Sequence, residues 1–95
     1  MIITLNTRVQ LRKSQSSSVL GTETIVLNYD LGNYYELNEM GSFIWSLLQA
    51  NETVSVMEIK ERMLAEFAVE EFVCQEELVS FLENLFHEKL IETGA

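Results

Sequence analysis

The chain has 95 residues, 47% of them hydrophobic, and its 15 acidic and 6 basic side chains give a formal charge of −9. This balance argues against binding to nucleic acid or to an anionic membrane, since both need Lys and Arg. The hydrophobic content suffices for one modest core, so we expect a single domain over residues 1–95. The charge is compatible with a basic or neutral protein or peptide partner, or with solubility alone.

Cysteine and histidine are too scarce to build a disulfide framework or a metal site. The chain holds one of each, Cys74 and His87, whereas a structural zinc ion takes about four such ligands. The N-terminus lacks the pattern of a signal peptide, and no stretch reaches the ~20 apolar residues of a membrane span. We therefore expect a cytoplasmic protein with no cofactor, no metal and no contact with a membrane.

Alternating apolar and polar residues predict β-structure in the first third of the chain. The first strand is expected over residues 2–12, with an inner face of Ile3, Leu5, Val9 and Leu11. Residues 13–21 hold four serines and close on Gly21, which is typical of a loop.

Two further strands are expected on either side of a short turn. The second covers residues 22–31, and its apolar face is Ile25, Leu27, Tyr29 and Leu31. Gly32 and Asn33 accept the positive φ of a turn, and the third strand covers residues 33–37. Strands joined by hairpins form an antiparallel sheet.

From residue 38 onward the apolar residues repeat with the helical period. Asn38 fits an N-cap, and Ser55 with Glu58 fits a capping box. The expected helices cover residues 39–50, 55–67 and 71–89. The expected core residues on these helices are Phe43, Ile44, Leu47, Ile59, Met63, Leu78, Leu82 and Leu85. Leu90 and Ile91 would follow as an apolar tail.

Strands followed by helices predict an α+β fold, a three-stranded antiparallel sheet followed by a three-helix winged helix-turn-helix. In a DNA-binding protein of this kind, helix 71–89 would be the recognition helix. Between residues 70 and 95 the chain has one basic residue, Lys89, against seven glutamates. We therefore expect no binding to nucleic acid.

Little catalytic chemistry is visible, so we expect no enzyme. The glycines are scattered and form no phosphate-binding loop. Acidic neighbours should raise the pKa of the Cys74 thiol and keep it unreactive. A thiol enzyme that uses Cys74 remains an alternative, which loss of activity in Cys74→Ser would reveal.

Helix 71–89 is apolar over about half of its circumference, which is more than one core needs. Either both flanks pack inside the domain, or one lines a groove for a partner. The second wall would be the third strand, which could pair with a peptide if it lies at the edge of the sheet. The expected peptide-binding residues are Tyr34, Tyr35, Glu36, Leu37, Phe72, Val73, Glu76, Glu77, Val79 and Glu83. Which flank faces the peptide stays open.

The segment Tyr34–Trp45 has a tyrosine-rich short strand, then Leu-Asn-Glu, and then Ile-Trp on the first helix. In this it resembles the PqqD-like family, also called RiPP recognition elements, and the resemblance extends from about Thr22 to Ile91. Two positions depart from the family pattern, because Lys89 stands where a glycine is frequent and Glu77 where an aspartate is common.

The resemblance implies a non-catalytic domain that binds the leader segment of a ribosomally made precursor peptide. The leader would add a strand to the third strand, lie against the last helix, and be presented to a leader peptidase or another maturation enzyme. The Tyr-Tyr-Glu-Leu-Asn segment is most similar to the stand-alone recognition proteins of lasso-peptide biosynthesis. The alternatives are a PqqD-type chaperone of PQQ biosynthesis and a winged-helix regulator.

Overall fold

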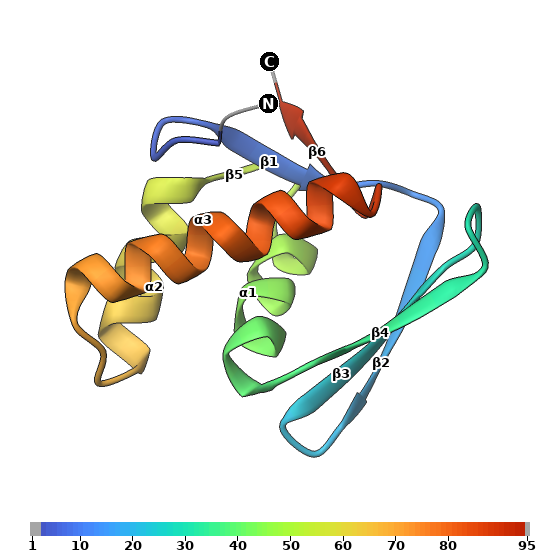
Figure 1. Ribbon diagram of the computed structural model, residues 1–95, viewed down its shortest axis with the longest axis horizontal. Helices are drawn as coiled ribbons and strands as arrows, with labels where there is room; N and C mark the ends of the chain where they lie inside the picture. The colour runs from blue at the N-terminus through green and yellow to red at the C-terminus, as the bar shows by residue number, and fades with distance from the viewer. Residues whose placement is uncertain (1–2, 95) are drawn as a thin grey trace.

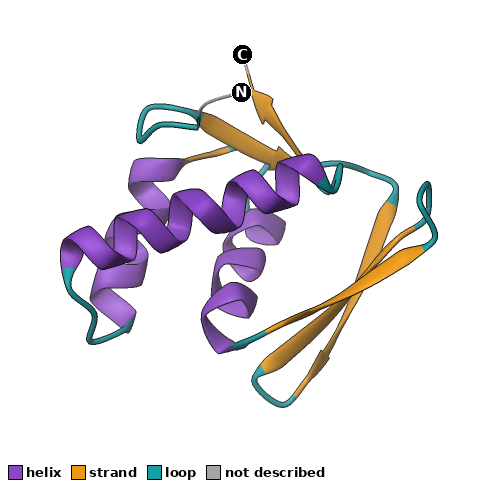
Figure 2. Ribbon diagram, viewed as in Figure 1, coloured by secondary structure: helices purple, strands orange, loops and turns teal. Residues whose placement is uncertain are grey.

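The computed structural model describes residues 3–94, which form an α+β fold of three helices and two small antiparallel sheets (Figures 1 and 2). The elements in chain order are β1 (Arg8–Leu11), β2 (Gln15–Leu20), β3 (Glu23–Asn28), β4 (Asn33–Leu37), α1 (Glu39–Ala50), β5 (Val54–Ser55), α2 (Val56–Glu66), α3 (Glu71–His87) and β6 (Ile91–Gly94). One sheet has the order β5-β1-β6 and the other β2-β3-β4. No helix within these residues is long and apolar enough to cross a membrane.

The described residues form two sheets instead of the single three-stranded sheet predicted, and the first predicted strand belongs to the other sheet from the hairpins. The strand expected over residues 2–12 covers Arg8–Leu11 and pairs with β5 and β6 instead of with the hairpins. Its expected start at residue 2 lies outside the described residues. The prediction that the sheet precedes the helices is therefore wrong for the β5-β1-β6 sheet, which takes strands from both ends of the chain.

The serine-rich segment is a strand, so the prediction of a loop over residues 13–21 is wrong. It forms β2 and pairs with β3 from Gln15↔Asn28 to Leu20↔Glu23. The hydroxyl of Ser17 accepts hydrogen bonds from Trp45 Nε1 at 3.2 Å and from Gln49 Nε2 at 2.9 Å. These bonds, like the pairing itself, join distant parts of the chain, and local sequence preferences do not reveal them.

The strand β3 turns the opposite face to the core from the one predicted. Thr24, Val26 and Asn28 are buried, while Leu27 and Tyr29 of the expected inner face are exposed. Asn28 can lie inside because all its polar groups are satisfied. Its amide donates to the Glu88 carbonyl at 2.9 Å, and its Oδ1 accepts from the backbone N–H groups of Asp30 and Leu31.

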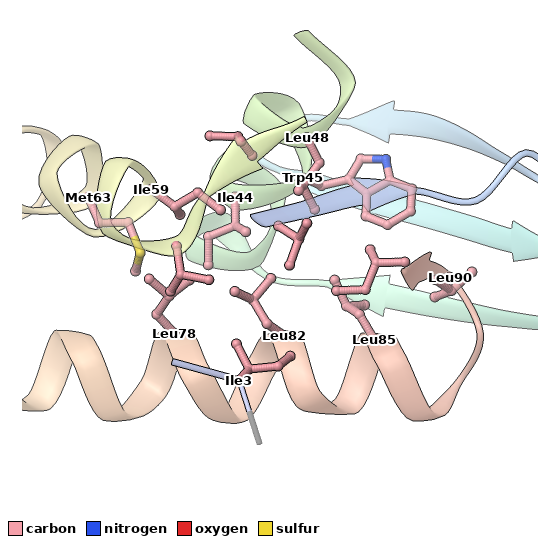
Figure 3. Packing of buried hydrophobic residues seen from close by; sticks show 14 of the residues in the cluster. Ile3, Ile44, Trp45, Leu48, Ile59, Met63, Leu78, Leu82, Leu85 and Leu90 are labelled. Atoms are coloured by element: carbon pink, nitrogen blue, oxygen red, sulfur yellow. The ribbon is translucent and has the colours of Figure 1, made fainter. Parts of the chain in front are cut away.

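The three helices meet around one apolar core, which Figure 3 shows from close by. Six of the predicted core residues are buried, namely Ile44, Ile59, Met63, Leu78, Leu82 and Leu85. Phe43 and Leu47 are only partly buried at its rim, and Trp45 and Leu48 take the central places on α1. The predicted apolar tail of Leu90 and Ile91 is fully buried, and Ile91 begins β6.

The helix ends follow the expected capping chemistry. The Asn38 side chain accepts from the Gly41 N–H at 2.8 Å, and Ser55 Oγ accepts from the Glu58 N–H at 3.1 Å. The helix α3 ends in a Schellman motif, in which Leu90 N–H donates to the Leu85 carbonyl and Lys89 N–H to the Phe86 carbonyl. Lys89 has a φ of 59° there, so the left-handed position that favours glycine is held by a lysine.

Candidate functional site

The strand β4 lies at an edge of its sheet. Within residues 3–94 it pairs only with β3, from Thr24↔Leu37 to Asn28↔Asn33. Its side chains alternate, so that Tyr35 and Leu37 point toward the helices while Tyr34 and Glu36 are exposed. An unpaired edge presents free backbone N–H and C=O groups to another strand. The predicted peptide-pairing segment Tyr34–Leu37 is therefore placed as strand addition requires.

A cleft of about 490 Å³ lies beside the point where β4 passes into α1. Its walls are the start of α1 and one flank of α3, and the buried Met63 of α2 also lines it. The residues that line it are Asn38, Met40, Gly41, Ile44, Met63, Glu76, Glu77, Ser80, Phe81 and Asn84. Figure 1 shows β4 leading into the start of α1, with α3 crossing the molecule above that point in this view.

Gly41 lets the two helices approach each other at this cleft. A Cβ at this position would lie 3.2 Å from Cε1 of Phe81, closer than most Cβ contacts. The glycine thus allows the Phe81 ring to pack against the backbone of α1. Because Asn38 caps the same turn, the end of β4, the start of α1 and the Phe81 ring are fixed relative to one another.

One flank of α3 faces the start of α1, next to the point where β4 ends. Glu77, Phe81 and Asn84 follow the spacing i, i+4, i+7 of one helix face and all line the cleft. Farther along the same flank, the Tyr35 hydroxyl donates to Glu88 Oε2 at 2.7 Å. This hydrogen bond, together with burial, raises the pKa of Tyr35. It ties β4 to the C-cap of α3.

The opposite flank of α3 lines a second cleft of about 600 Å³ against residues 3–6. Val79 and Glu83 lie in it with Ile3 and Leu5, away from β4, whereas Glu76 and Ser80 reach both clefts.

Only some of the α3 residues predicted to bind the peptide therefore line the cleft at the end of β4. Glu76 and Glu77 line the cleft beside β4, and Val79 and Glu83 line the other one. Phe72 and Val73 are exposed at the start of α3 and line neither cleft. Sequence reasoning missed Phe81 and Asn84 as wall residues, although their spacing from Glu77 is a signal that could have found them.

The cleft beside β4 is acidic. Glu76 and Glu77 supply the charges among the described residues that line it. Such a lining favours a peptide with a basic side chain at this point. Within residues 3–94 no cluster of three His, Cys, Asp or Glu is placed to hold a metal ion. The Cys74 thiol is buried among apolar residues, and this burial raises its pKa.

Two solved structures share the fold of this chain. The solved structure "TbiB1 in Complex with the TbiA(beta) Leader Peptide" is 29% identical in sequence to this chain. The two superpose with a TM-score of 0.82, and the match covers 90% of this chain and 98% of that chain. "Lasso peptide synthetase B1 complexed with the leader peptide" shares the fold at 19% identity, with a TM-score of 0.73 over 88% of this chain and 96% of that one. No curated protein matches.

The family comparison covers the segment that carries the site. The model of "Coenzyme PQQ synthesis protein D (PqqD)" matches residues 23–91, from β3 to the start of β6. This range holds the edge strand, the cleft and the three helices, and it agrees with the resemblance seen from about Thr22 to Ile91. The chain belongs to the PqqD family.

Proposed function

We propose that this domain binds the leader segment of a ribosomally made precursor peptide as a strand added to β4. The observation that carries the proposal is the unpaired edge of β4 beside the cleft between α1 and α3. The flank of Glu77, Phe81 and Asn84 forms the second wall. The leader peptide in the complex of TbiB1, which shares this fold at 29% identity, supports a ligand of the same class.

The domain would act without catalysis, in the cytoplasm, by holding the precursor for a leader peptidase or another maturation enzyme of lasso-peptide biosynthesis. The buried Cys74 thiol is unsuited to act as a nucleophile. We further propose that the helices are a winged helix-turn-helix used for peptide binding, since the acidic charge opposes DNA. A PqqD-type chaperone of PQQ biosynthesis is the second candidate, which the family description favours. The two candidate functions are distinguished by which precursor peptide the domain binds, that of a lasso peptide or that of PQQ.

A matched pair of variants tests the wall. Asn84 lines the cleft beside β4, and its neighbour Glu83 lines the opposite one. The variant Asn84→Phe should fill the proposed site with its ring. It should weaken the binding of a fluorescein-labelled synthetic leader by at least about tenfold, or ~1.4 kcal/mol. Glu83→Phe places the same ring on the other flank and should bind as the wild type does, with folding of both checked by circular dichroism. If only Glu83→Phe loses affinity, the peptide uses the other flank and the proposed wall is wrong.

A set of modified leaders tests the strand pairing. In an antiparallel pair, N–H groups point toward the neighbouring strand at every second residue. Methylating one backbone nitrogen at a time should therefore weaken binding at alternate positions, with the intervening positions tolerant. If the loss of affinity does not alternate from one leader position to the next, the result would contradict strand addition. The loss of affinity at high salt would measure how much the acidic lining contributes to the free energy of leader binding.

A further inference from the structure

The helix α2 contributes a buried positive charge, Lys60, to its contact with α3. Lys60 is the one charged residue that the fold buries within residues 3–94, and 8% of its side chain is exposed. Its Nζ donates a hydrogen bond to Glu71 Oε1 at 3.0 Å and another to Gln75 Oε1 at 2.9 Å. These two acceptors stand four residues apart on α3, which places them on the same face in successive turns. A single ammonium group therefore holds the first two turns of α3 against α2.

Polar side chains hold α3 at both of its ends, and apolar packing holds it in between. Lys60 makes the contacts at the start of the helix. At the C-cap, Glu88 accepts hydrogen bonds from the Tyr35 hydroxyl and, through its carbonyl, from the Asn28 amide. The middle of the helix packs through leucines that are buried in the core. Apolar burial is non-directional, so the hydrogen bonds at the two ends define the rotation of α3 about its own axis.

The bonds of Lys60 specify a position more than they add stability. Burying an ammonium group costs free energy that its partners only offset, and replacing a buried ion pair by apolar atoms often leaves stability unchanged or raises it. Glu71 does not need the lysine, because its side chain is 70% exposed and lies in the first turn of α3, where the helix dipole favours an anion. Loss of the Lys60 charge would therefore leave no unpaired charge in the core.

The first half of α3 also carries one wall of the cleft beside β4. Glu76 and Glu77 directly follow Gln75 in the sequence and line that cleft. A rotation of α3 by a single residue position, about 100°, would turn both glutamates away from it. Phe81 lies roughly 9 Å farther along the helix axis than Gln75, and its ring packs closely on Gly41. The same rotation would therefore move this ring off α1.

We propose that Lys60 is a positioning residue for the leader site. It fixes the rotation of α3 and thereby forms the wall of the cleft beside β4, without touching the peptide, since neither Lys60 nor Gln75 lines that cleft. The inference rests on the proposed function, because it takes this cleft as part of the leader site. It predicts that leader affinity depends on Lys60 although the stability of the domain does not.

Substitution by methionine tests this role, because Met is as unbranched as Lys and carries no charge. Arg62→Met is the matched control, since Arg62 is exposed on the same helix. Lys60→Met should unfold at the urea concentration of the wild type or higher, and it should bind a fluorescein-labelled synthetic leader about threefold or more weakly. Arg62→Met should match the wild type in both measurements. Gln75→Met removes one hydrogen bond but keeps the ion pair, so it should weaken leader binding by a smaller factor.

An NMR signature separates a rotated helix from any other cause of weaker binding. The Phe81 ring lies against Gly41, so its ring current contributes to the chemical shift of the Gly41 amide. In nitrogen–proton correlation spectra recorded without leader, this resonance should move in Lys60→Met and keep its place in Arg62→Met.

The proposal is overturned if Lys60→Met binds leader as tightly as the wild type, or if its Gly41 resonance does not move. A clearly lower urea midpoint of Lys60→Met would also overturn it, because Lys60 would then act through stability. Wild type that binds no leader refutes the proposed function itself. The Gly41 resonance, measured in the absence of leader, still reports in that case whether Lys60 sets the rotation of α3.

Discussion

The lysine at the end of α3 allows a direct measurement of backbone strain in this fold. Lys89 occupies the left-handed position of a Schellman motif with a φ of 59°, which costs a residue with a Cβ roughly 1–2 kcal/mol. Lys89→Gly removes that cost but also gives the unfolded chain more freedom, which offsets about 0.4–1 kcal/mol. We therefore expect the glycine variant to be more stable by about 0.5–1 kcal/mol. For a domain of this size that is a rise in Tm of roughly 2–8 °C.

Urea unfolding provides the assay, with the fluorescence of Trp45 as the probe, because it is the chain's one tryptophan and is buried. Lys89→Ala is the matched control. It removes the same charge near the helix C-terminus but keeps a Cβ at the strained position, so it should be no more stable than the wild type. If Lys89→Gly proves no more stable than Lys89→Ala, the left-handed backbone at this position carries no measurable strain, and the reasoning fails.

Three further predictions follow from the core and its titratable groups. Leu82→Ala leaves a cavity in a fully buried place and should lower the unfolding free energy by about 2–5 kcal/mol in urea titrations; a loss below about 1 kcal/mol would contradict the packing. The hydrogen bond to Glu88 raises the pKa of Tyr35, so its stabilisation is complete below about pH 10 and is lost as the pH rises through the raised pKa. Tyr35→Phe should flatten this alkaline fall in stability, and an unchanged slope would show that the bond does not form. The buried Cys74 thiol, whose pKa burial raises, should react with Ellman's reagent far more slowly in the native protein than in urea, and equal rates would contradict its burial.

The sequence predicts the helices and the edge strand well because their signals are local. Asn38 and Ser55 make the capping bonds expected of them, and Leu78, Leu82 and Leu85 point into the core as their spacing indicates. The segment Tyr34–Leu37 has the expected place in β4.

The parts that were missed depend on contacts between distant residues. The face of β3 is decided by Asn28, whose amide meets the Glu88 carbonyl 60 positions away. The serine-rich β2 forms because β3 and Trp45 provide its partners. The flank of α3 that faces the start of α1 depends on the close approach of Phe81 to Gly41. Helical periodicity places Glu77, Phe81 and Asn84 on one flank of α3, but it does not contain the information that this flank lies against α1.

The pairing of β1 with β6 has a mechanical consequence. These antiparallel strands match Arg8 with Gly94 at one end and Leu11 with Ile91 at the other, so the described chain enters β1 and leaves β6 at the same end of the sheet (Figure 1). A force that pulls the ends apart acts first on the bonds that the Leu5 and Thr7 carbonyls accept from α2 and on the Arg8–Gly94 pair. The following pairs of β1 and β6 are then loaded one after another. Tension on the ends would therefore open the β5-β1-β6 sheet first, while the free edge of β4 belongs to the other sheet, which does not bear this initial force.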